Sequence, residues 1–322
     1  MGSVNLDNTG SGSAITLSSD GTDLLLNGTA IGGGGGGADL YDANESSPTA
    51  QPSATGTNAI AIGDSAVSSN TKSFALGKSR ASGNLSFAAA IQNNSTSKGA
   101  TGSQCIAMGY GAYSPGGNSV AIAINSNSGT GSNNLAMMRG SITGGKSNSL
   151  AIGYNSRCDQ ANATALGYHS VALSRGKFAY QGMSSKPAGY AQMGLVNLCG
   201  TTTDATPEVL SNSNGTNLDY AQLLIPNNTS YTFTGVISAR EKASEGTDVG
   251  GWELKGVIRR EGSASTTTLV NSIINDINVP TGWAVAVSAD TTNGALSVTV
   301  TGVASTNITW VATIYTSEVT YV

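Results

Sequence analysis

An alanine that recurs about every 14 residues is the feature that most restricts how this chain can fold. It stands between larger residues in most copies, as in Ile60-Ala61-Ile62 and Leu150-Ala151-Ile152. Successive steps are 14, 15, 17, 14, 15, 15, 14 and 14 residues long. A fixed period of this kind indicates stacked repeats that bury their faces on one another. The nine alanines are Ala61, Ala75, Ala90, Ala107, Ala121, Ala136, Ala151, Ala165 and Ala179.

The length of the repeat predicts what each unit contains. Fourteen residues are too few for a helix and a strand, but they suit two short strands and two turns. Because side chains alternate along a strand, the alanine lies on one face and its large neighbours on the other, and the alanine face is expected to pack closely. A second small position, which includes Cys158, is expected to pack in the same way. Nine coils stacked at roughly 4.8 Å would rise about 40 Å.

Two copies of the repeat resemble a known family. The segments NAIAIGDSA (58–66) and NSLAIGYNS (148–156) are similar to the head repeat of YadA-type trimeric adhesins. The resemblance covers residues 58–182 and implies a left-handed parallel β-roll of about nine coils, with three chains packed around one axis as a homotrimer. The copies around Ala90, Ala121, Ala136 and Ala179 lack the usual glycine, and the step to Ala107 is long, which predicts a bulged or decorated coil.

The segments on either side of the repeats lack the 14-residue pattern and are predicted to form other structures. Residues 1–31 are predicted to form a small β segment with a hairpin, followed by a glycine-rich linker over 32–57. A polar connector is expected over 183–217. Alternating residues on both sides of Asn293-Gly294 predict a β-sandwich or jelly-roll-like domain over 218–322, so the whole chain is expected to be all-β. Parts of this domain, 225–243 and 251–262, are similar to terminal domains of bacteriophage fibre-like proteins.

Composition argues against several classes of partner. The formal net charge is −4 and only 11% of residues are charged, which disfavours a nucleic-acid partner. Three cysteines and one histidine stand far apart, so no metal or other cofactor is predicted. The longest apolar runs fall short of the roughly 20 residues of a membrane helix. The N-terminus shows no charged stretch before an apolar core, so we expect neither membrane insertion nor a signal peptide.

One stretch matches the phosphate-binding P-loop pattern. GSITGGKS (140–147) fits G-x-x-x-x-G-K-[ST], which needs a strand before it and a helix after it. The match falls between two copies of the repeat, which leaves no room for a helix. We therefore expect a coil turn with Lys146 in solvent, and no nucleotide site.

Residues suited to catalysis are scarce. The one histidine, His169, falls in a coil turn, and no nucleophile elbow is present. Glycan cleavage uses paired carboxylates. The candidates are interspersed with Lys and Arg, which is typical of a mixed β-surface, so no catalytic residue is predicted. These carboxylates are Asp219, Glu241, Glu245, Asp248, Glu253 and Glu261.

All three tryptophans lie in the C-terminal segment. Trp283 and Trp310 alternate in phase with Val and Ile, which predicts that both are core residues. Trp252 follows two glycines after a charged loop, so it is the candidate for an exposed receptor contact. Glu245 and Asp248 of that loop are the other candidate contacts.

These patterns favour a structural virion fibre that is extracellular when it acts. Its N-terminus would join tail or capsid proteins, and its C-terminal domain would bind a host cell-surface receptor, either a glycan or a protein. Two alternatives remain, the passenger head of a bacterial trimeric adhesin and a polysaccharide depolymerase. Tail and capsid positions are not distinguished by the sequence.

Overall fold

The computed structural model describes residues 50–184, 186–213 and 221–321, together with four short strands nearer the N-terminus. Strands make up nearly all of its regular structure, and the one helix among the described residues is the 3-10 turn Ala264–Thr266. The chain divides into two compact units, Met1–Ser46 and Ser47–Val322. The all-β prediction is therefore confirmed.

The N-terminal unit contains a four-stranded antiparallel sheet in the order β1-β2-β3-β4. Strands β2 and β3 pair Leu17 with Leu26 and Ser19 with Leu24, so the predicted hairpin is present. The glycine run of the predicted linker lies outside the described residues. The strands are β1 (Val4–Leu6), β2 (Ile15–Ser19), β3 (Leu24–Leu26) and β4 (Thr29–Ala30).

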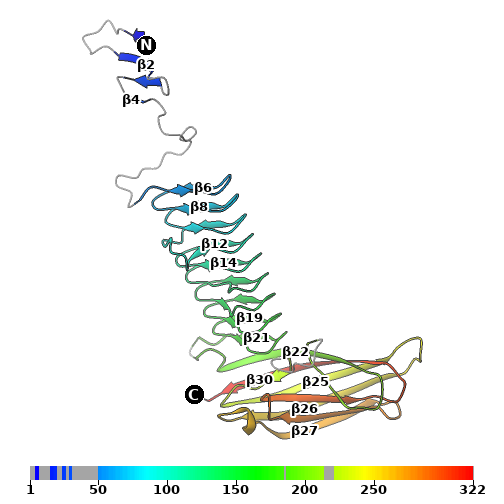
Figure 1. Cartoon of the computed structure of the whole chain (residues 1–322). Coiled ribbons are helices and arrows are strands. Elements are labelled where there is room, and N and C mark those ends of the chain that lie inside the picture. The colour runs from blue at the N-terminus through cyan, green and yellow to red at the C-terminus, as the bar shows by residue number, and fades with distance from the viewer. Residues whose placement is uncertain are drawn as a thin grey trace. The chain divides into compact units, whose positions relative to one another are not determined.

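The repeats form a parallel β-roll with two opposed layers, each called a roll sheet (Figure 1). In the second layer a five-stranded and a three-stranded sheet are linked through isolated bridges at Asn127. The first sheet holds β6 (Ile60–Ile62), β8 (Phe74–Leu76), β10 (Phe87–Ala89), β12 (Ile106–Met108), β14 (Val120–Ile122), β15 (Leu135–Met137), β17 (Leu150–Ile152), β19 (Thr164–Gly167) and β21 (Phe178–Gln181). The second holds β5 (Ser53–Ala54), β7 (Val67–Ser68), β9 (Arg80–Ala81), β11 (Gly99–Ala100), β13 (Tyr113–Ser114), β16 (Ile142–Thr143), β18 (Arg157–Cys158) and β20 (Val171–Ala172). Because β5 pairs with β7, the roll begins inside the segment predicted to be linker.

Strand register confirms eight of the nine predicted alanines and corrects one. In the third coil, Ala88 and not Ala90 aligns with Ala75 and Ala107. The sequence there contains three successive alanines, so the pattern alone does not fix the phase. The structure aligns Phe87 with Phe74 and stacks their rings at 5.6 Å, which turns Ala88 inward.

Ala90 instead takes the turn position that follows the strand. Its φ is 54°, in the left-handed region that glycine adopts most readily. Gly77 and Gly109 hold the same position in neighbouring coils, with φ of 62° and 102°. The predicted decoration is confirmed, since the extra residues after Ala90 form a loop whose Asn94 donates a hydrogen bond to Ser65 O at 2.9 Å.

The alanines face the interior of their own coil. From Ala75 to Ala179 the aligned alanines are fully buried, between the two sheets of one chain. A second interior column, two residues before each alanine, also holds small side chains, among them Ser86, Cys105 and Ser119. Cys158 is buried as well, which confirms its packing role. The closely packed alanine face is thus satisfied within the chain, and the large flanking residues point outward.

A positive-φ position three residues before each alanine explains why many copies begin with asparagine. Asparagine tolerates the left-handed region better than most residues. From coil to coil, the side chains of Asn118, Asn133, Asn148 and Asn162 form a ladder of hydrogen bonds at 3.3, 3.0 and 3.1 Å.

The P-loop match forms a corner of the roll, as predicted. Its Ile142 and Thr143 belong to β16, and its Gly144 and Gly145 form the turn that follows. The next element is β17, a strand, and Lys146 is exposed. His169 is also in a turn, with φ of 59°, as predicted.

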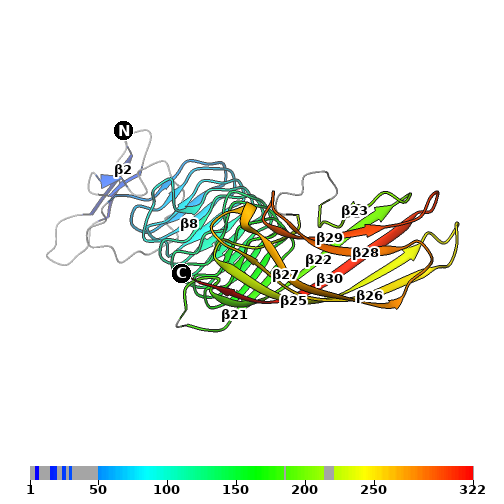
Figure 2. The same ribbon diagram turned by 90° about the horizontal axis from the view of Figure 1, so that it is seen from below.

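The C-terminal domain is a two-layer β-sandwich (Figure 2). One layer has the order β27-β26-β25-β30-β22, and in the other β29 pairs with β23, β24 and β28. Strand β22 lies in the segment predicted to be a connector, so the sandwich begins before residue 218. The strands are β22 (Ala191–Thr202), β23 (Glu208–Val209), β24 (Leu223–Leu224), β25 (Thr229–Glu241), β26 (Val249–Arg260), β27 (Thr268–Asn278), β28 (Ala284–Asp290), β29 (Ala295–Thr301) and β30 (Ile308–Thr320).

All three tryptophans lie in the core between these layers. Trp310 packs between Trp252 and Trp283, with ring centroids 5.5 and 5.4 Å apart. Trp310 also donates a hydrogen bond from Nε1 to Thr202 Oγ1 at 3.0 Å, which satisfies its buried N–H. The core prediction for Trp283 and Trp310 is confirmed.

Candidate functional site

Two columns of large side chains cover the outer face of the first roll sheet. Aligned positions put Ile60, Phe74 and their equivalents in one column, and Ile62, Leu76 and their equivalents in the other. Many are half-exposed, and Ile106 and Met108 are 38% and 40% exposed. No charged residue occurs in either column. The two columns are Ile60, Phe74, Phe87, Ile106, Val120, Leu135, Leu150, Thr164 and Phe178, and Ile62, Leu76, Ala89, Met108, Ile122, Met137, Ile152, Leu166 and Tyr180.

The second roll sheet presents a different outer face. Its aligned outward positions include Arg80 and Arg157 as well as Tyr113 and Asn127. Charged and polar side chains of this kind are compatible with contact with water. The two faces of the roll therefore differ, and only the first offers a continuous uncharged surface.

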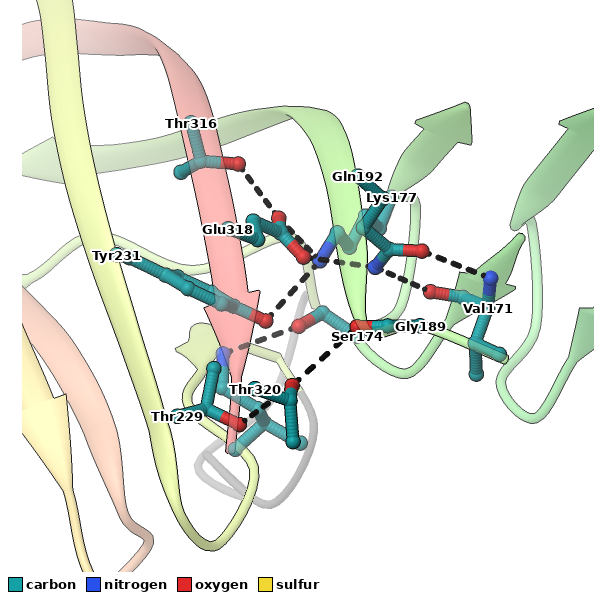
Figure 3. Close-up of polar contacts among 11 residues, drawn as sticks. Val171, Ser174, Lys177, Gly189, Gln192, Thr229, Tyr231, Thr316, Glu318 and Thr320 are labelled. Carbon is teal, nitrogen blue, oxygen red and sulfur yellow. Dashed lines mark hydrogen bonds and ion pairs between the residues drawn. The ribbon is translucent and has the colours of Figure 1, made fainter. Parts of the chain in front are cut away.

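A buried ion pair joins the last coil of the roll to the sandwich (Figure 3). Lys177 occupies the interior column that holds Ser, Cys, Asn or Ala in earlier coils, and it ends that column. Its Nζ lies 2.6 Å from Glu318 Oε1 on β30, with the two side chains 0% and 1% exposed.

Further groups satisfy both charges. Gln192 donates a hydrogen bond from Nε2 to Glu318 Oε2 at 2.7 Å, and Thr316 Oγ1 donates to Glu318 Oε1 at 2.5 Å. The Lys177 ammonium also lies 5.0 Å from the Tyr231 ring centroid. Burial beside the Glu318 carboxylate holds the pKa of Tyr231 well above its usual value. The Tyr231 phenol therefore stays neutral.

Two neighbours of the ion pair show that the junction is closely fitted. Gln192 pairs with both backbone groups of Val171, at 2.9 Å each, and so continues the hydrogen bonding of the second roll sheet into the sandwich. A Cβ at Gly194 would meet the Glu318 carboxylate and the Lys177 stem, so a larger residue there would have to displace the buried ion pair. Sequence reasoning missed this junction. Its one local signal is the lysine in a column of small residues.

An open groove of about 610 Å³ lies on the outer face of the sandwich at the ends of β22, β25 and β30. These strand ends point away from the roll, beside the β25–β26 loop at the far end of the domain (Figure 1). The lining combines an exposed guanidinium with amide, hydroxyl and carboxylate groups. It comprises Thr201, Ser238, Arg240, Glu241, Lys242, Ala243, Asn307, Thr309 and Val311.

The structure separates the three predicted receptor contacts. Trp252 is 1% exposed, so the prediction that it contacts a receptor is wrong. Its side chain points inward because Trp252 lies on β26 in register with Ile237, and both face the second layer. Glu245 and Asp248 are exposed in the loop beside the groove, and whether they touch a receptor stays a prediction.

Glu245 holds the loop against the groove. It accepts hydrogen bonds from Asn307 N and Nδ2, both at 2.7 Å, and these bonds lower its pKa. The other end of the loop is closed by a hydrogen bond from Glu241 N to Asp248 O at 3.0 Å. Glu245 thereby orders Asn307, which lines the groove.

The remaining carboxylates stand beside cations, as a mixed β-surface predicts. Glu253 lies 2.8 Å from Lys255, and Glu261 lies 3.2 Å from Arg259. Hydrogen bonds from Lys255 and Asn275 lower the pKa of Glu253, so this group is ionised at neutral pH. Asp219 lies outside the described residues.

Metal-binding clusters and membrane-spanning helices are both absent from the part of the chain that the structure describes. No group of three or more His, Cys, Asp or Glu side chains there is arranged to hold a metal ion. No helix among the described residues has the length and hydropathy that crossing a membrane requires.

Comparisons with known proteins give one match to a family and several distant matches to solved structures. No curated protein matches the chain. Two tailspike structures are 10% identical to it, one from Acinetobacter baumannii bacteriophage Fri1, a capsular polysaccharide depolymerase, and one from A. baumannii phage AM24. Their TM-scores are 0.26 and 0.21, with 76% and 79% of this chain covered. The chain spans 40% and 47% of those two proteins. The YadA head domain repeat matches residues 54–79, 100–122 and 146–173, so the roll carries repeats of the YadA head type.

Proposed function

We propose that the chain is an attachment fibre. The repeats form a trimeric shaft, and the sandwich presents the groove at its far end to a receptor on a host cell. The groove carries this proposal, because it lies on a domain that is joined to the roll through one continuous sheet and a buried ion pair. A receptor held there would be rigidly coupled to the shaft. No catalytic step is included in the proposal.

A bacterial surface glycan is the proposed receptor. The groove is open and lined by Arg240, Asn307 and several hydroxyl groups, which can exchange hydrogen bonds with sugar hydroxyl and acidic groups. Three copies in one fibre would turn weak single contacts into avid attachment. The N-terminal unit would join tail or capsid proteins of a virion.

The trimer rests on the two outer columns together with the match to YadA head repeats. Residues close to a symmetry axis meet their own copies, so a charged column would face like charge. The uncharged columns avoid this cost and gain from burial. Light scattering on the purified full chain should give three times the monomer mass. A monomeric mass would contradict the trimer.

The receptor proposal is tested by the full chain on an array of bacterial lipopolysaccharides and capsular polysaccharides. We expect binding to a subset of glycans, weakened on the order of tenfold by Arg240→Ala, the equivalent of about 1.4 kcal/mol. Arg259→Ala is the control, because Arg259 is an exposed arginine outside the groove. Equal loss from both variants, or no glycan bound, would contradict the proposal.

The two alternative functions give different results. Release of new reducing ends from a bound polysaccharide, abolished by a carboxylate variant, would show a depolymerase. Retention of the expressed chain in a bacterial outer membrane would favour an adhesin. Blocking of phage adsorption by the free chain would favour the fibre.

A further inference from the structure

The two outer columns of the roll continue into the C-terminal domain without a break in register. Strand β22 pairs with β21 so that Leu195 lies opposite Phe178 and Met193 opposite Tyr180. Strand β30 then places Tyr315 opposite Leu195. The apolar surface therefore continues from the strands of the roll onto strands of the sandwich, whose sequence has no repeat.

Exposure along this continuation matches that of the roll columns. Met193 and Tyr315 are 43% and 49% exposed, against 38% for Ile106 and 40% for Met108 in the roll. Val319, two positions beyond Ser317 on the same outer face of β30, is 53% exposed. A lone chain thus leaves large apolar groups in water on both sides of the junction.

The surface has a definite end. On β25 the columns continue as Thr234 and Thr232, and on β26 as Lys255 and Val257. Two threonines on β25 and then a lysine in one column on β26 interrupt the uncharged apolar surface, so its continuous part ends at β30.

We propose that the self-association surface of this protein extends beyond the repeats onto the outer face of β22 and β30, where second copies of the chain cover Met193, Leu195 and Tyr315. This inference rests on the proposed trimer. A copy of the same chain is the occupant because the surface continues the roll columns in register. Its lack of charge also makes it complementary to itself around an axis.

The interface would fix the sandwiches to one another as well as to their own rolls. Each sandwich is already joined to its own roll through one sheet and the buried ion pair. Contact through β22 and β30 would add direct contacts between the sandwiches and so help to hold the three far-end grooves at constant spacing. Fixed spacing is what allows several sites to engage one surface together.

Cross-linking tests the inference in the full-length chain. Met193→Cys is introduced in a Cys199→Ser background, because Cys199 is an exposed thiol. The remaining thiols, Cys105 and Cys158, are buried, and burial raises their pKa to about 11 and about 12, so they do not react at pH 7. A short bis-maleimide should join Met193→Cys chains to one another. Val270→Cys, on the distant strand β27 and 56% exposed, should remain uncross-linked.

A second variant measures the contribution to assembly. Tyr315→Glu places a charge in the proposed interface and should raise the concentration at which the trimer dissociates by on the order of tenfold or more. Val270→Glu should leave it unchanged, and circular dichroism checks that both variants fold. A trimer in which neither Met193→Cys cross-links nor Tyr315→Glu weakens assembly would overturn the inference but leave the proposed trimer intact. A monomeric wild-type chain would overturn both.

Discussion

The roll and the sandwich are built on the same 14-stranded sheet, yet their interiors hold side chains of opposite size. Inside the roll, the aligned alanines and serines leave little space between two sheets of one coil. Inside the sandwich, three tryptophans pack together with Phe233, Leu254 and Ile314. The roll therefore depends on repeated turns and backbone hydrogen bonds, and the sandwich on the burial of large apolar groups.

The two regions should therefore be sensitive to opposite changes in side-chain volume. Loss of volume should damage the sandwich, whereas gain of volume should damage the roll. The junction is sensitive to charge instead, because it buries the ammonium group of Lys177 in a column of small residues.

Trp310→Ala should lower the free energy of unfolding of the sandwich by about 3–5 kcal/mol, since it removes the central ring of the core and a satisfied hydrogen bond. Calorimetry of the full chain measures the loss. Val270→Ala, at an exposed position on β27, should change stability by less than about 0.5 kcal/mol. Similar values for the two variants would contradict the large-residue core.

Lys177→Met should cost about 3–5 kcal/mol, because it leaves the Glu318 carboxylate buried without its cation. Adding Glu318→Gln should recover part of that loss. In urea unfolding, Arg259→Met serves as the control, since its ion pair with Glu261 is exposed and worth under about 1 kcal/mol. A cost for Lys177→Met no larger than the control's would show that the pair does not hold the junction.

Ala136→Leu should destabilise the roll by about 1–3 kcal/mol, because the alanine is fully buried between two sheets and has no room for added methylenes. The readout is thermal unfolding followed by circular dichroism. Lys146→Leu adds a leucine to the exposed corner of the next turn and should be close to neutral. An Ala136→Leu variant as stable as wild type would mean that the roll interior is loosely packed.

Cys105→Ser should change the free energy of unfolding by under about 1 kcal/mol at pH 7. The two side chains are similar in size, and core substitutions that conserve volume are tolerated best. Ser86 holds the same column position and donates to Gly83 O at 2.7 Å, as Cys105 Sγ does to Gly102 O at 2.8 Å.

At alkaline pH, the Cys105→Ser variant tests whether ionisation of the Cys105 thiol affects stability. Burial raises the pKa of the Cys105 thiol from 9.0 to about 11. Above pH 9 the unfolded thiol loses its proton while the folded one keeps it, so wild-type stability should fall between pH 9 and 11. Denaturant midpoints across that range should fall less steeply for Cys105→Ser. Identical slopes would show that the thiol does not contribute.

The repeats were predictable because their information is local. Each coil closes within about 15 residues, so the spacing of the alanines, the small second position and the turn residues are all visible in the sequence. The P-loop match could be dismissed in the same way, from its place between two copies. The phase failed at Ala90, where three adjacent alanines offered equal choices and the stacking of Phe74 on Phe87 decided between them.

The parts that could not be predicted depend on pairing between distant residues. Trp252 is buried because β26 aligns with β25, and the glycines before it gave no sign of that register. Strand β22 looked like a connector because its partner β30 begins more than 100 residues later.

The repeat pattern and composition were enough to predict an all-β chain with a nine-coil roll, small residues inside it and a tryptophan-containing domain after it. Folding in three dimensions adds that the alanines face their own coil, that large residues form an outward surface, and that this surface continues through β22. It also paired Lys177 with Glu318. Local periodicity encodes a coil, whereas contacts between coil and sandwich arise only when strands far apart in the chain come together.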